Sequence, residues 1–531
     1  MELFASMVYS FRTNLYKFIS IKGILFILIL ELLILLSNVF YPILFSNATN
    51  QIMAGIQLDN RVVLLILIIL ISSKTMSLVK SRFYSNFYVS TVAKLKKHLF
   101  ELFLVSNCKE KITYGNFIQI INNHVNDSVN FLIRNNVSLV ISMAGTVLFS
   151  ILLVSVNAHL LFFVLLFPVI HIVNSKLLSN IREMQKQYFD EREKYLNKIN
   201  TYIQSVDDIK INYDHKVVLN KFSKNLDKVL NVFRELEQKV ITVTSITSFF
   251  TSIVFIIFIY ICYNMTNKGE LQIRDFVQAI FYYNLLSSSI QNNFAYFQSV
   301  NQNIISIIKI EEFINSNTSA KKKTCKQDET EGVNLLICNL NYAYEKNKNV
   351  LVDFNLLIDN CGVFVLVGEN GVGKSTLLQL ISGTLLADKG IVKLNGYETW
   401  EYSFGTYLST CNEKNKLYDI SLVENLASKM QSYNDNDVLS VFDELNIPRS
   451  VISRNIEKND FSSGEKNKLF LARALITKSK VILLDEPSNY LDELSKEHFL
   501  NVLKKYRNQA VFLIATHDTD IIEIADSVVA L

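Results

Sequence analysis

Long runs of apolar residues dominate the N-terminal part of the chain. A helix needs about 20 apolar residues to cross a hydrocarbon core of about 30 Å. Six segments meet this length, at about 23–45, 61–79, 134–155, 159–177, 240–263 and 276–298, and the last of them is the most polar. The pattern therefore predicts an all-α transmembrane domain with six helices over residues 1–315.

Positive charge is distributed unevenly among the segments that connect these spans. The short connections at 46–60 and 264–275 carry few lysines or arginines, whereas 80–130 and 175–239 carry many. Cytoplasmic connections are enriched in Lys and Arg, so both long segments are predicted to lie in the cytosol. Aromatic residues that recur through positions 1–21 predict an additional helix lying on the surface of the lipid bilayer.

The remainder of the chain follows a different pattern. A polar and charged stretch at 316–332 predicts a linker, and beyond it short apolar runs alternate with helical segments. Such alternation is typical of an α/β fold built on a parallel sheet. Residues 333–531 are therefore predicted to form a second, α/β domain.

A glycine-rich segment between one of these apolar runs and a helical segment carries the clearest chemical signal. Residues 368–376 have the sequence Gly-Glu-Asn-Gly-Val-Gly-Lys-Ser-Thr and follow the predicted strand 363–367. This context predicts a phosphate-binding loop (P-loop), in which backbone N–H groups and a helix N-terminus surround phosphate oxygens. Lys374 is expected to reach the β- and γ-phosphates of ATP, and Ser375 to bind Mg²⁺. The expected nucleotide contacts are Gly368, Asn370, Gly371, Gly373, Lys374, Ser375 and Thr376.

Two further apolar runs end in residues suited to phosphate chemistry. The run Val481–Asp485 is followed by Glu486, and a run that begins at Val511 ends just before His517. Phosphoryl transfer needs a metal-binding carboxylate and a residue that orients or activates the attacking water. We expect Asp485 to bind Mg²⁺, Glu486 to activate water, and His517 to contact the γ-phosphate. With Lys374, these residues make up the predicted catalytic group.

The composition excludes several classes of protein. Hydrophobic residues make up 50% of the chain and the mean hydropathy is positive, which is too apolar for an ordinary soluble enzyme. The net charge of +4 gives no indication of a nucleic-acid partner. The six cysteines are scattered without a C-x-x-C pair, so neither a zinc site nor a disulfide framework is expected.

With these motifs the chain resembles the ABC exporter family, specifically half-transporters with six spans and one ATP-binding cassette. The resemblance covers essentially the whole chain. Residues 461–465, Phe-Ser-Ser-Gly-Glu, look like the family's signature L-S-G-G-Q, and Asn489–Asp492 is similar to the loop that links its two ATP sites. The resemblance implies that Tyr344 stacks on adenine. It also implies that the signature of one subunit contacts the nucleotide of the other through Ser462, Ser463, Gly464 and Glu465.

The chain departs from the family's pattern at two places. The signature has Phe461, Ser463 and Glu465 at its first, third and fifth positions, and Glu413 falls where the family has a nucleotide- and metal-binding Gln. A one-residue slip of the alignment would place Asn412 there instead. A carboxylate accepts hydrogen bonds but does not donate them, so these departures affect the expected hydrolysis rate and Mg²⁺ coupling more than nucleotide binding.

Polar residues within the spans predict a cargo cavity. Glu31 lies near the centre of the first span, where an ionised carboxylate costs about 2.5–3.5 kcal/mol. It is expected to face a water-filled cavity or a partner such as Lys74 or His171, and His171 is included in the predicted cavity. Asn284 and Gln291 belong to a polar stripe along the sixth span and complete it. Residues of this kind also hold helices together without any cargo.

The resemblance implies ATP-driven export by a dimer. One chain supplies one phosphate loop and one signature, so a homodimer is expected, with a heterodimer left open. The polar cavity suits an amphipathic or polar cargo such as a modified peptide. Flipping of a lipid or lipid-linked saccharide is the first alternative, and an ATP-gated regulatory or channel-like protein is the second. A composition rich in Ile, Lys and Asn indicates an AT-rich bacterial genome, and no Arg-rich transit segment is visible, so the inner (plasma) membrane of a bacterium is expected.

Overall fold

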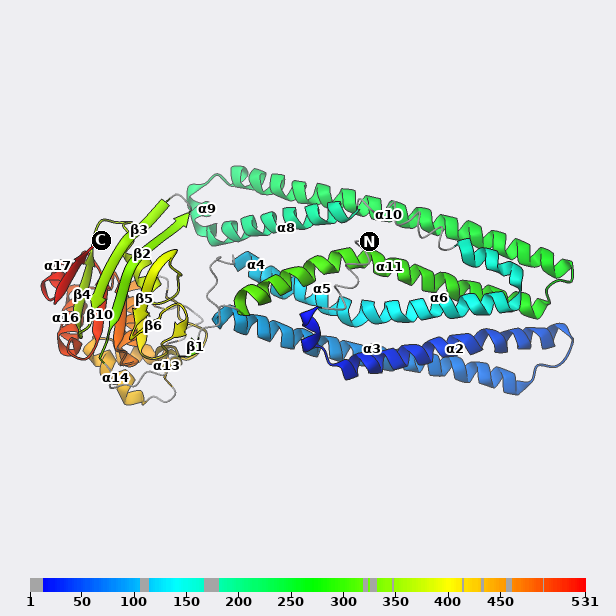
Figure 1. Ribbon diagram of the computed structural model, residues 1–531, viewed down its shortest axis with the longest axis horizontal. Helices are drawn as coiled ribbons and strands as arrows, with labels where there is room; N and C mark the ends of the chain where they lie inside the picture. Colours follow the sequence, from blue (N-terminus) through cyan, green and yellow to red (C-terminus); the bar gives the residue numbers. More distant parts are fainter. Residues whose placement is uncertain are drawn as a thin grey trace. The chain divides into compact units, whose positions relative to one another are not determined.

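The structure is a computed structural model that describes residues 13–105, 114–166, 181–318, 323–324, 332–345, 348–412, 415–430, 434–454, 461–489 and 491–531. The chain divides into two compact units. One comprises Met1–Glu101 and Ile112–Asn315, and the other comprises Leu102–Lys111 and Ser316–Leu531. The first unit is helical and the second is α/β (Figure 1). This confirms the predicted fold class.

Long helices run through the first unit. They are α2 (Ile21–Met53), α3 (Asn60–Val105), α8 (Ile181–Gln204), α10 (His215–Asn267) and α11 (Ile273–Thr318). A further helix, Tyr114–Val156, is continuous but contains two π-helical turns, in the order α4 (Tyr114–Gln119), η2 (Ile120–His124), α5 (Val125–Asn130), η3 (Phe131–Asn135) and α6 (Asn136–Val156). The short helices are η1 (Asn14–Phe18), η4 (Ala158–Leu160) and α9 (Val206–Asn212).

Within the described part of the chain, 4 helices are long and apolar enough to cross a membrane. They are Ile21–Met53, Asn60–Leu104, Asn116–Val156 and His215–Asn267, which cover the first, second, third and fifth predicted spans. The sixth predicted span is helical, within α11, but its many amide and hydroxyl side chains make it too polar to qualify by composition. Most of the fourth predicted span, 159–177, lies outside the described residues.

An aromatic core holds several of these helices together. Phe163, Phe258 and Tyr283 are fully buried, and the Tyr283 ring stacks on Phe258 with the ring centroids 4.4 Å apart. Many apolar side chains of α2 and α3 instead point away from the unit, such as Ile29 (53% exposed) and Leu64 (58% exposed). Exposed apolar surface of this extent marks an interaction surface, and a lipid bilayer covers it best.

A five-stranded parallel sheet with strand order β11–β4–β10–β9–β8 forms the centre of the second unit. Its strands are β4 (Gly362–Val367), β8 (Leu408–Cys411), β9 (Val481–Asp485), β10 (Val511–Ala515) and β11 (Ser527–Ala530). β10 is buried throughout, and its Ala515 pairs with Leu366 on one side and Asp485 on the other. This register ends β4, β9 and β10 at the same edge of the sheet.

A second, antiparallel sheet packs against one face of the parallel sheet. Its strand order is β3–β2–β5–β6, with β2 (Leu335–Glu345), β3 (Lys348–Ile358), β5 (Lys389–Leu394) and β6 (Tyr397–Glu398). The short strands β1 (Lys323–Thr324) and β7 (Tyr402–Ser403) pair in parallel. The helices are α12 (Lys374–Ile381), α13 (Leu422–Ala427), α14 (Asp435–Glu444), η5 (Arg449–Ser453), α15 (Ser463–Ile476), α16 (Glu493–Tyr506) and α17 (Thr519–Glu523).

Side chains of the central strands alternate between two hydrophobic cores. Val481 and Leu483 pack with α12 and the antiparallel sheet, whereas Ile482 and Leu484 pack with α13 to α16. Both faces of the sheet are therefore covered. This explains why these strands appear in the sequence as continuous apolar runs rather than as alternating ones.

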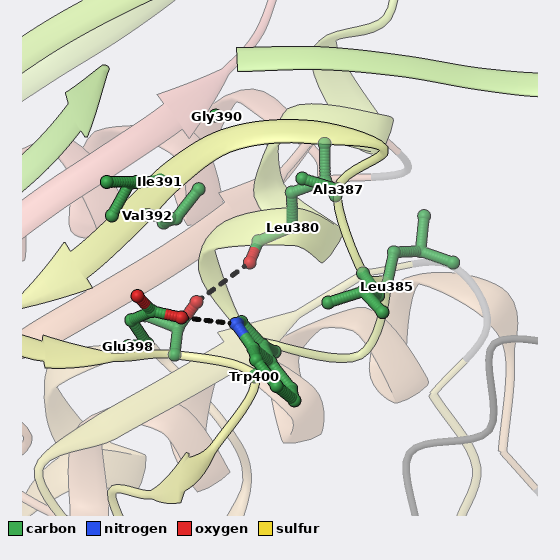
Figure 2. Close-up of a pocket in the computed structure, with 10 residues that line it drawn as sticks. Leu380, Leu385, Ala387, Gly390, Ile391, Val392, Glu398 and Trp400 are labelled. Atoms are coloured by element: carbon green, nitrogen blue, oxygen red, sulfur yellow. Dashed lines mark hydrogen bonds between the residues drawn. The ribbon is translucent and has the colours of Figure 1, made fainter. Parts of the chain in front are cut away.

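Glycines fix the antiparallel sheet at two points. Asn395 and Gly396 form the two-residue turn between β5 and β6, both with positive φ (49° and 82°), as Asn-Gly hairpins require. Gly390 has a φ of 92°, and a methyl group there would lie 2.7 Å from the Cys338 carbonyl oxygen and closer still to the main chain of Asn339. Gly390 also lines a cavity of about 270 Å³ beside Trp400 (Figure 2).

We predict that Gly390→Ala destabilises the second unit more than Gly396→Ala. At Gly396 a methyl group meets nothing within 4 Å, so the cost is the left-handed backbone alone, about 1–2 kcal/mol. At Gly390 the main chain of β2 must also move. Trp400 is the only tryptophan in the chain, so thermal unfolding followed by tryptophan fluorescence of the purified full chain reports on this unit. Equal melting temperatures for the two variants would contradict the prediction.

Candidate active site and membrane cavity

The loop between β4 and α12 adopts the conformation that its glycines allow. Gly371 and Gly373 have φ values of 86° and 119°, in the left-handed region. A methyl group on Gly373 would lie 2.8 Å from Cγ1 of Val350, whereas one on Gly371 would meet nothing within 4 Å. The loop is therefore tight against β3 and open on its outer side. Because α12 begins at Lys374, the unpaired N–H groups of its first turn are available to an anion.

The side chain of Lys374 lies back along this loop and is 8% exposed. Its Nζ donates to the carbonyl oxygen of Gly368 at 2.7 Å and lies 2.8 Å from Nε2 of His517. Oδ1 of Asn370 lies 3.1 Å from the same His517 nitrogen. The hydrogen-bond partners of Lys374 are carbonyl oxygens and an imidazole, and among the described residues no carboxylate forms an ion pair with it.

Ser375 and Asp485 bring two oxygens together at the edge of the sheet. Oγ of Ser375 donates to Oδ1 of Asp485 at 2.9 Å. Hydroxyl and carboxylate oxygens are ligands that Mg²⁺ prefers, and Mg²⁺ bound to phosphates takes only one or two carboxylates from a protein. Within the described residues no cluster of three or more His, Cys, Asp or Glu side chains could hold a metal. The Ser375–Asp485 pair therefore fits an ion that is shared with a phosphate.

Next to this loop, the Tyr344 hydroxyl lies 3.1 Å from Oγ1 of Thr376, and the tyrosine side chain is 52% exposed. The described residues thus include an exposed aromatic ring beside the start of α12. A ring in this position is available for stacking by a flat base. The role given to Tyr344 from the family resemblance stays a prediction.

Glu486 follows β9 with a left-handed backbone, at a φ of 47°, and its N–H donates to the Ala515 carbonyl oxygen at 2.8 Å. Its Oε1 lies 4.0 Å from Nε2 of His517. Burial raises the pKa of the Glu486 carboxyl, while the charges of His517 and Lys374 act in the opposite direction. A raised pKa makes this carboxylate a stronger proton acceptor near neutral pH, as a general base requires.

The signature segment starts a helix. Ser462 is the N-cap of α15, and with Glu465 it forms a capping box: Ser462 N–H donates to Oε2 of Glu465 at 2.9 Å, and Glu465 N–H donates to Oγ of Ser462 at 3.2 Å. Nη1 of Arg454 donates to Oε1 of Glu465 at 2.7 Å. The Glu465 carboxylate thus accepts hydrogen bonds from the start of the helix and from an arginine. These contacts give a local structural reason for the departure from Gln at this position. Ser463 and Gly464 occupy the first turn.

Two contacts that were not predicted from the sequence hold the loops that carry Glu486 and His517. Nζ of Lys496 on α16 pairs with Asp518 at 2.7 Å and with Asp520 at 2.5 Å. Nδ2 of Asn467 on α15 donates to the carbonyl oxygens of Pro487, at 3.0 Å, and Asn489, at 2.6 Å. The Asp518 position before α17 is a typical N-cap signal. Nothing in the sequence marks its lysine partner.

The first unit contains a polar cavity of about 720 Å³ among its apolar helices. Glu31 lines it and pairs with Nζ of Lys80 at 2.8 Å. Arg134 lies over the ring of Tyr84, 5.9 Å from its centroid, and both residues also line the cavity. Hydroxyl and amide side chains complete the polar part of the lining: Asn38, Ser77, Ser81, Ser85, Tyr88, Ser138, Ser142, Ser288, Ser289 and Asn292.

The structure brings together only part of the predicted cargo site. Glu31 lines the cavity, but its partner is Lys80 rather than Lys74. Asn284 and Gln291 are exposed and lie outside this lining, and Nε2 of Gln291 donates to Oγ of Ser287 at 3.4 Å. From α11 the cavity instead receives Ser288, Ser289 and Asn292. His171 and Glu413 lie outside the described residues.

The residues at this edge of the parallel sheet are arranged to bind and cleave a nucleotide. The helical unit, with its long apolar helices, is suited to a membrane. Together they define a membrane-embedded ATPase. Residues 24–290 match the family model described as "ABC transporter transmembrane region". Residues 351–489 match the family model described as "ABC transporter". The chain belongs to the ABC transporter family. It carries the membrane domain and the ATP-binding domain of that family in one chain.

Known relatives differ in what they transport. A putative export ATP-binding/permease protein of Rickettsia typhi is 21% identical over 89% of this chain and 85% of its own length. A lacticin/lactococcin transport/processing ATP-binding protein of Lactococcus lactis is 24% identical over 74% of this chain. A glutathione/L-cysteine transport ATP-binding/permease protein of Bacillus subtilis is 28% identical over 38% of this chain. The chain spans 56% of the length of the lacticin relative and 37% of the glutathione relative.

The fold has a counterpart among solved structures. A bacterial Atm1-family ABC exporter with ATP bound matches with a TM-score of 0.80 over 96% of this chain and 93% of that chain, at 12% sequence identity. The likeness concerns the fold, a helical membrane domain followed by an ATP domain.

Glu486→Gln is expected to lower the rate of ATP hydrolysis by about 10²–10⁴-fold, because an amide cannot accept the proton of the attacking water. ATP binding should persist, since the phosphate loop is unchanged. Turnover of purified protein in lipid nanodiscs and equilibrium binding of ATP measure the two effects. Glu497 is an exposed carboxylate on α16, so Glu497→Gln makes the same chemical change as a control. A Glu486→Gln variant with parental turnover would show that another group is the base.

Proposed function

We propose that two copies of this chain use ATP to export a polar or amphipathic peptide across a bacterial inner membrane. In this proposal residues 1–315 form the transmembrane domain, 316–332 the linker and 333–531 the ATP-binding cassette. Both family matches fall within these bounds, at 24–290 and 351–489. The proposed export direction follows the printed function of the Rickettsia relative.

The described contacts support specific roles in ATP hydrolysis. Lys374 and the first turn of α12 hold the β- and γ-phosphates, and Glu486 takes a proton from water while His517 positions the γ-phosphate. Ser375 and Asp485 would hold Mg²⁺, which would neutralise phosphate charge as the bond to the leaving oxygen breaks. Thr376, Gly368 and Asn370 complete the loop, and Tyr344 stacks on the base. Glu413, or Asn412 beside it, is placed at the nucleotide by the family resemblance alone.

The signature helix supports a site shared between two copies. The capping box of α15 occupies the N–H groups of Ser462 and Glu465, so the N–H groups of Ser463 and Gly464 in its first turn are the ones suited to an anion. Among the described residues this helix start forms no hydrogen bond or ion pair with the phosphate loop of its own chain, and α15 contacts the segment after β9 through Asn467. A second copy of the chain would supply the nucleotide that this helix end faces. Glu465, engaged with Arg454 and Ser462, contributes by fixing the helix start.

The charged cavity of the membrane unit is the observation that carries the cargo proposal. An ion pair within an apolar unit is costly to bury, and the Glu31–Lys80 pair is only about a quarter exposed on each side chain (24% and 25%). Arg134 and a set of hydroxyl groups face the same space. This lining offers both charges and hydrogen-bonding groups, which suits a peptide better than a purely apolar compound.

A lipid-linked saccharide remains the second candidate cargo, because its sugar hydroxyls and phosphates could use the same polar groups. The relative that transports lacticin favours a peptide, whereas the glutathione/L-cysteine relative shows that the family also moves small thiol compounds. An ATP gate without transport is less well supported, since the half-buried Glu486, with its raised pKa, is suited to hydrolysis.

We predict that mixed dimers reveal a shared ATP site. A chain carrying Lys374→Ala is combined with a chain carrying Ser462→Arg, each purified through a different affinity tag. The mixed dimer should keep one intact site and part of the parental ATPase rate, whereas each variant alone should have almost none. A mixed dimer as inactive as the single variants, or an active species with the mass of one chain, would contradict the shared site.

The export proposal is tested in inside-out vesicles, whose outer medium reaches the ATP domain and is supplied with ATP and a mixed peptide library. Peptides should accumulate in the lumen with the parental chain and not with Glu486→Gln, as measured by mass spectrometry of washed vesicles. Glu31→Gln should raise the half-saturating peptide concentration about tenfold or more, since loss of one charge-assisted contact typically costs about 1.5–3 kcal/mol. The half-saturating ATP concentration should not change.

The outcomes separate the candidate cargoes. Accumulation of lipid-linked saccharide without peptide would favour the flippase. ATP hydrolysis with no accumulation of either class would contradict export. Ser77→Ala serves as a control for general packing effects, because Ser77 lines the same cavity without a charge.

A further inference from the structure

A second polar cavity, of about 630 Å³, lies in the first unit and is separate from the one that contains Glu31. Its lining comes from the π-helical stretch at η2 and α5 and from α8, α10 and α11. Figure 1 shows α8 running beside α10, and the two helices are in contact. The volume lies within the range of about 300–1,000 Å³ that is typical of ligand pockets.

A buried amide faces this cavity without a partner. Gln185 on α8 is 8% exposed, and its side chain forms no hydrogen bond with any described residue. The amide keeps its hydrogen-bonding capacity free among the described residues. It is therefore suited to a ligand that supplies hydrogen bonds.

Three charged side chains of both signs line the same space, namely Arg192, Asp127 and Glu237. Arg192 on α8 and Asp127 on α5 both line the cavity, and neither side chain forms a hydrogen bond or an ion pair with another residue that the structure describes. Asn122 and Asn123 add amide groups, and the rings of Tyr188 and Phe233, with centroids 5.3 Å apart, add an apolar wall. A ligand that carries an anionic end, a cationic end and an apolar part would satisfy all of these groups.

The two cavities share no lining residue, and along the chain buried side chains stand between the two linings. Phe131 and Tyr296 are stacked with ring centroids 5.5 Å apart, and the Tyr296 hydroxyl donates to Oδ1 of Asn136 at 2.9 Å. Nδ2 of Asn135 donates to Oγ of Ser299, which lines the second cavity. The two spaces are thus distinct sites along the same π-interrupted helix. Most of the second lining, on η2, α5, α8 and part of α10, lies in the stretches that the positive charges assign to the cytosolic side.

We propose that this cavity binds a short zwitterionic peptide segment before it reaches the cavity of Glu31. Arg192 pairs with a carboxylate of the peptide, Asp127 with an ammonium group, and the Gln185 amide with the peptide backbone. Tyr188 and Phe233 contact an apolar side chain. This inference deepens the proposed function and rests on it, because it assigns a second site to the same class of cargo.

The test measures binding of the tripeptide Leu-Ala-Leu, with free termini, to the purified full chain in the absence of nucleotide by isothermal titration calorimetry. The same tripeptide with an acetylated N-terminus and an amidated C-terminus should bind at least about tenfold more weakly. Arg192→Gln and Asp127→Asn should each weaken binding of the free peptide roughly ten- to hundredfold, since charge-assisted hydrogen bonds are worth about 1.5–3 kcal/mol. Arg234 on α10 is exposed and outside the cavity lining, so Arg234→Gln should bind as the parent does.

Gln185→Leu distinguishes a binding role from a structural one. Leucine has a similar size and removes an unsatisfied polar group, so the melting temperature should stay equal or rise while peptide affinity falls roughly tenfold. A lower melting temperature together with unchanged affinity would make Gln185 a structural residue and overturn the proposal.

The remaining outcomes separate this site from the proposed function. If Glu31→Gln weakens binding and the variants at 127, 185 and 192 do not, the peptide binds in the first cavity; the export proposal then stands and this one fails. If the parental chain exports peptides into vesicles but the capped and free tripeptides bind equally, the cavity does not select a zwitterion and this proposal alone fails. Absence of both export and binding overturns both.

Discussion

The ATP chemistry of this protein depends on the pairing of one strand. β10 is buried between β4 and β9, and its last residue, Ala515, is opposite Leu366 on one side and Asp485 on the other. Because the three strands end in register, the phosphate loop, the metal-suited carboxylate and the histidine meet at one edge. A shift of one residue would reverse which side chains of β10 enter each hydrophobic core. The two cores on either face of the sheet therefore protect the geometry of the site as well as the stability of the fold.

Much of this site could be predicted because its residues are neighbours in the sequence or directly follow strands. Lys374 and Ser375 belong to a local pattern, and Glu486 and His517 each follow an apolar run. Contacts that depend on tertiary packing could not be predicted. Lys496 reaches Asp518 and Asp520 from another helix. In the sequence, Glu465 is a departure from the signature pattern. Its structural role, in the capping box and with Arg454, depends on contacts that the pattern does not show.

The membrane unit shows a similar limit. Hydropathy identified Glu31 as a residue that needs a partner, but counting depth along the spans suggested Lys74, whereas the structure pairs it with Lys80. Six residues of helix correspond to about 9 Å, and depth alone does not say which face of α3 turns toward α2. The same limit applies to the polar stripe of the last span. The segment is helical as predicted, but the residues that line the cavity are Ser288, Ser289 and Asn292 rather than Asn284 and Gln291.

The π-helical turns of the Tyr114–Val156 helix have a consequence for how such a protein can change over evolutionary time. Each π turn, at η2 and η3, accommodates one residue more than an α-helical turn does. Inserting or deleting a residue within the helix rotates the part on one side of the change relative to the part on the other. The part of the helix before η3 faces one cavity with Asn122 and Asp127. The part that begins with η3 faces the other cavity with Arg134 and Ser138. A single codon gained or lost could thus exchange an entire set of lining side chains at once, a route to new cargo that point substitutions do not offer.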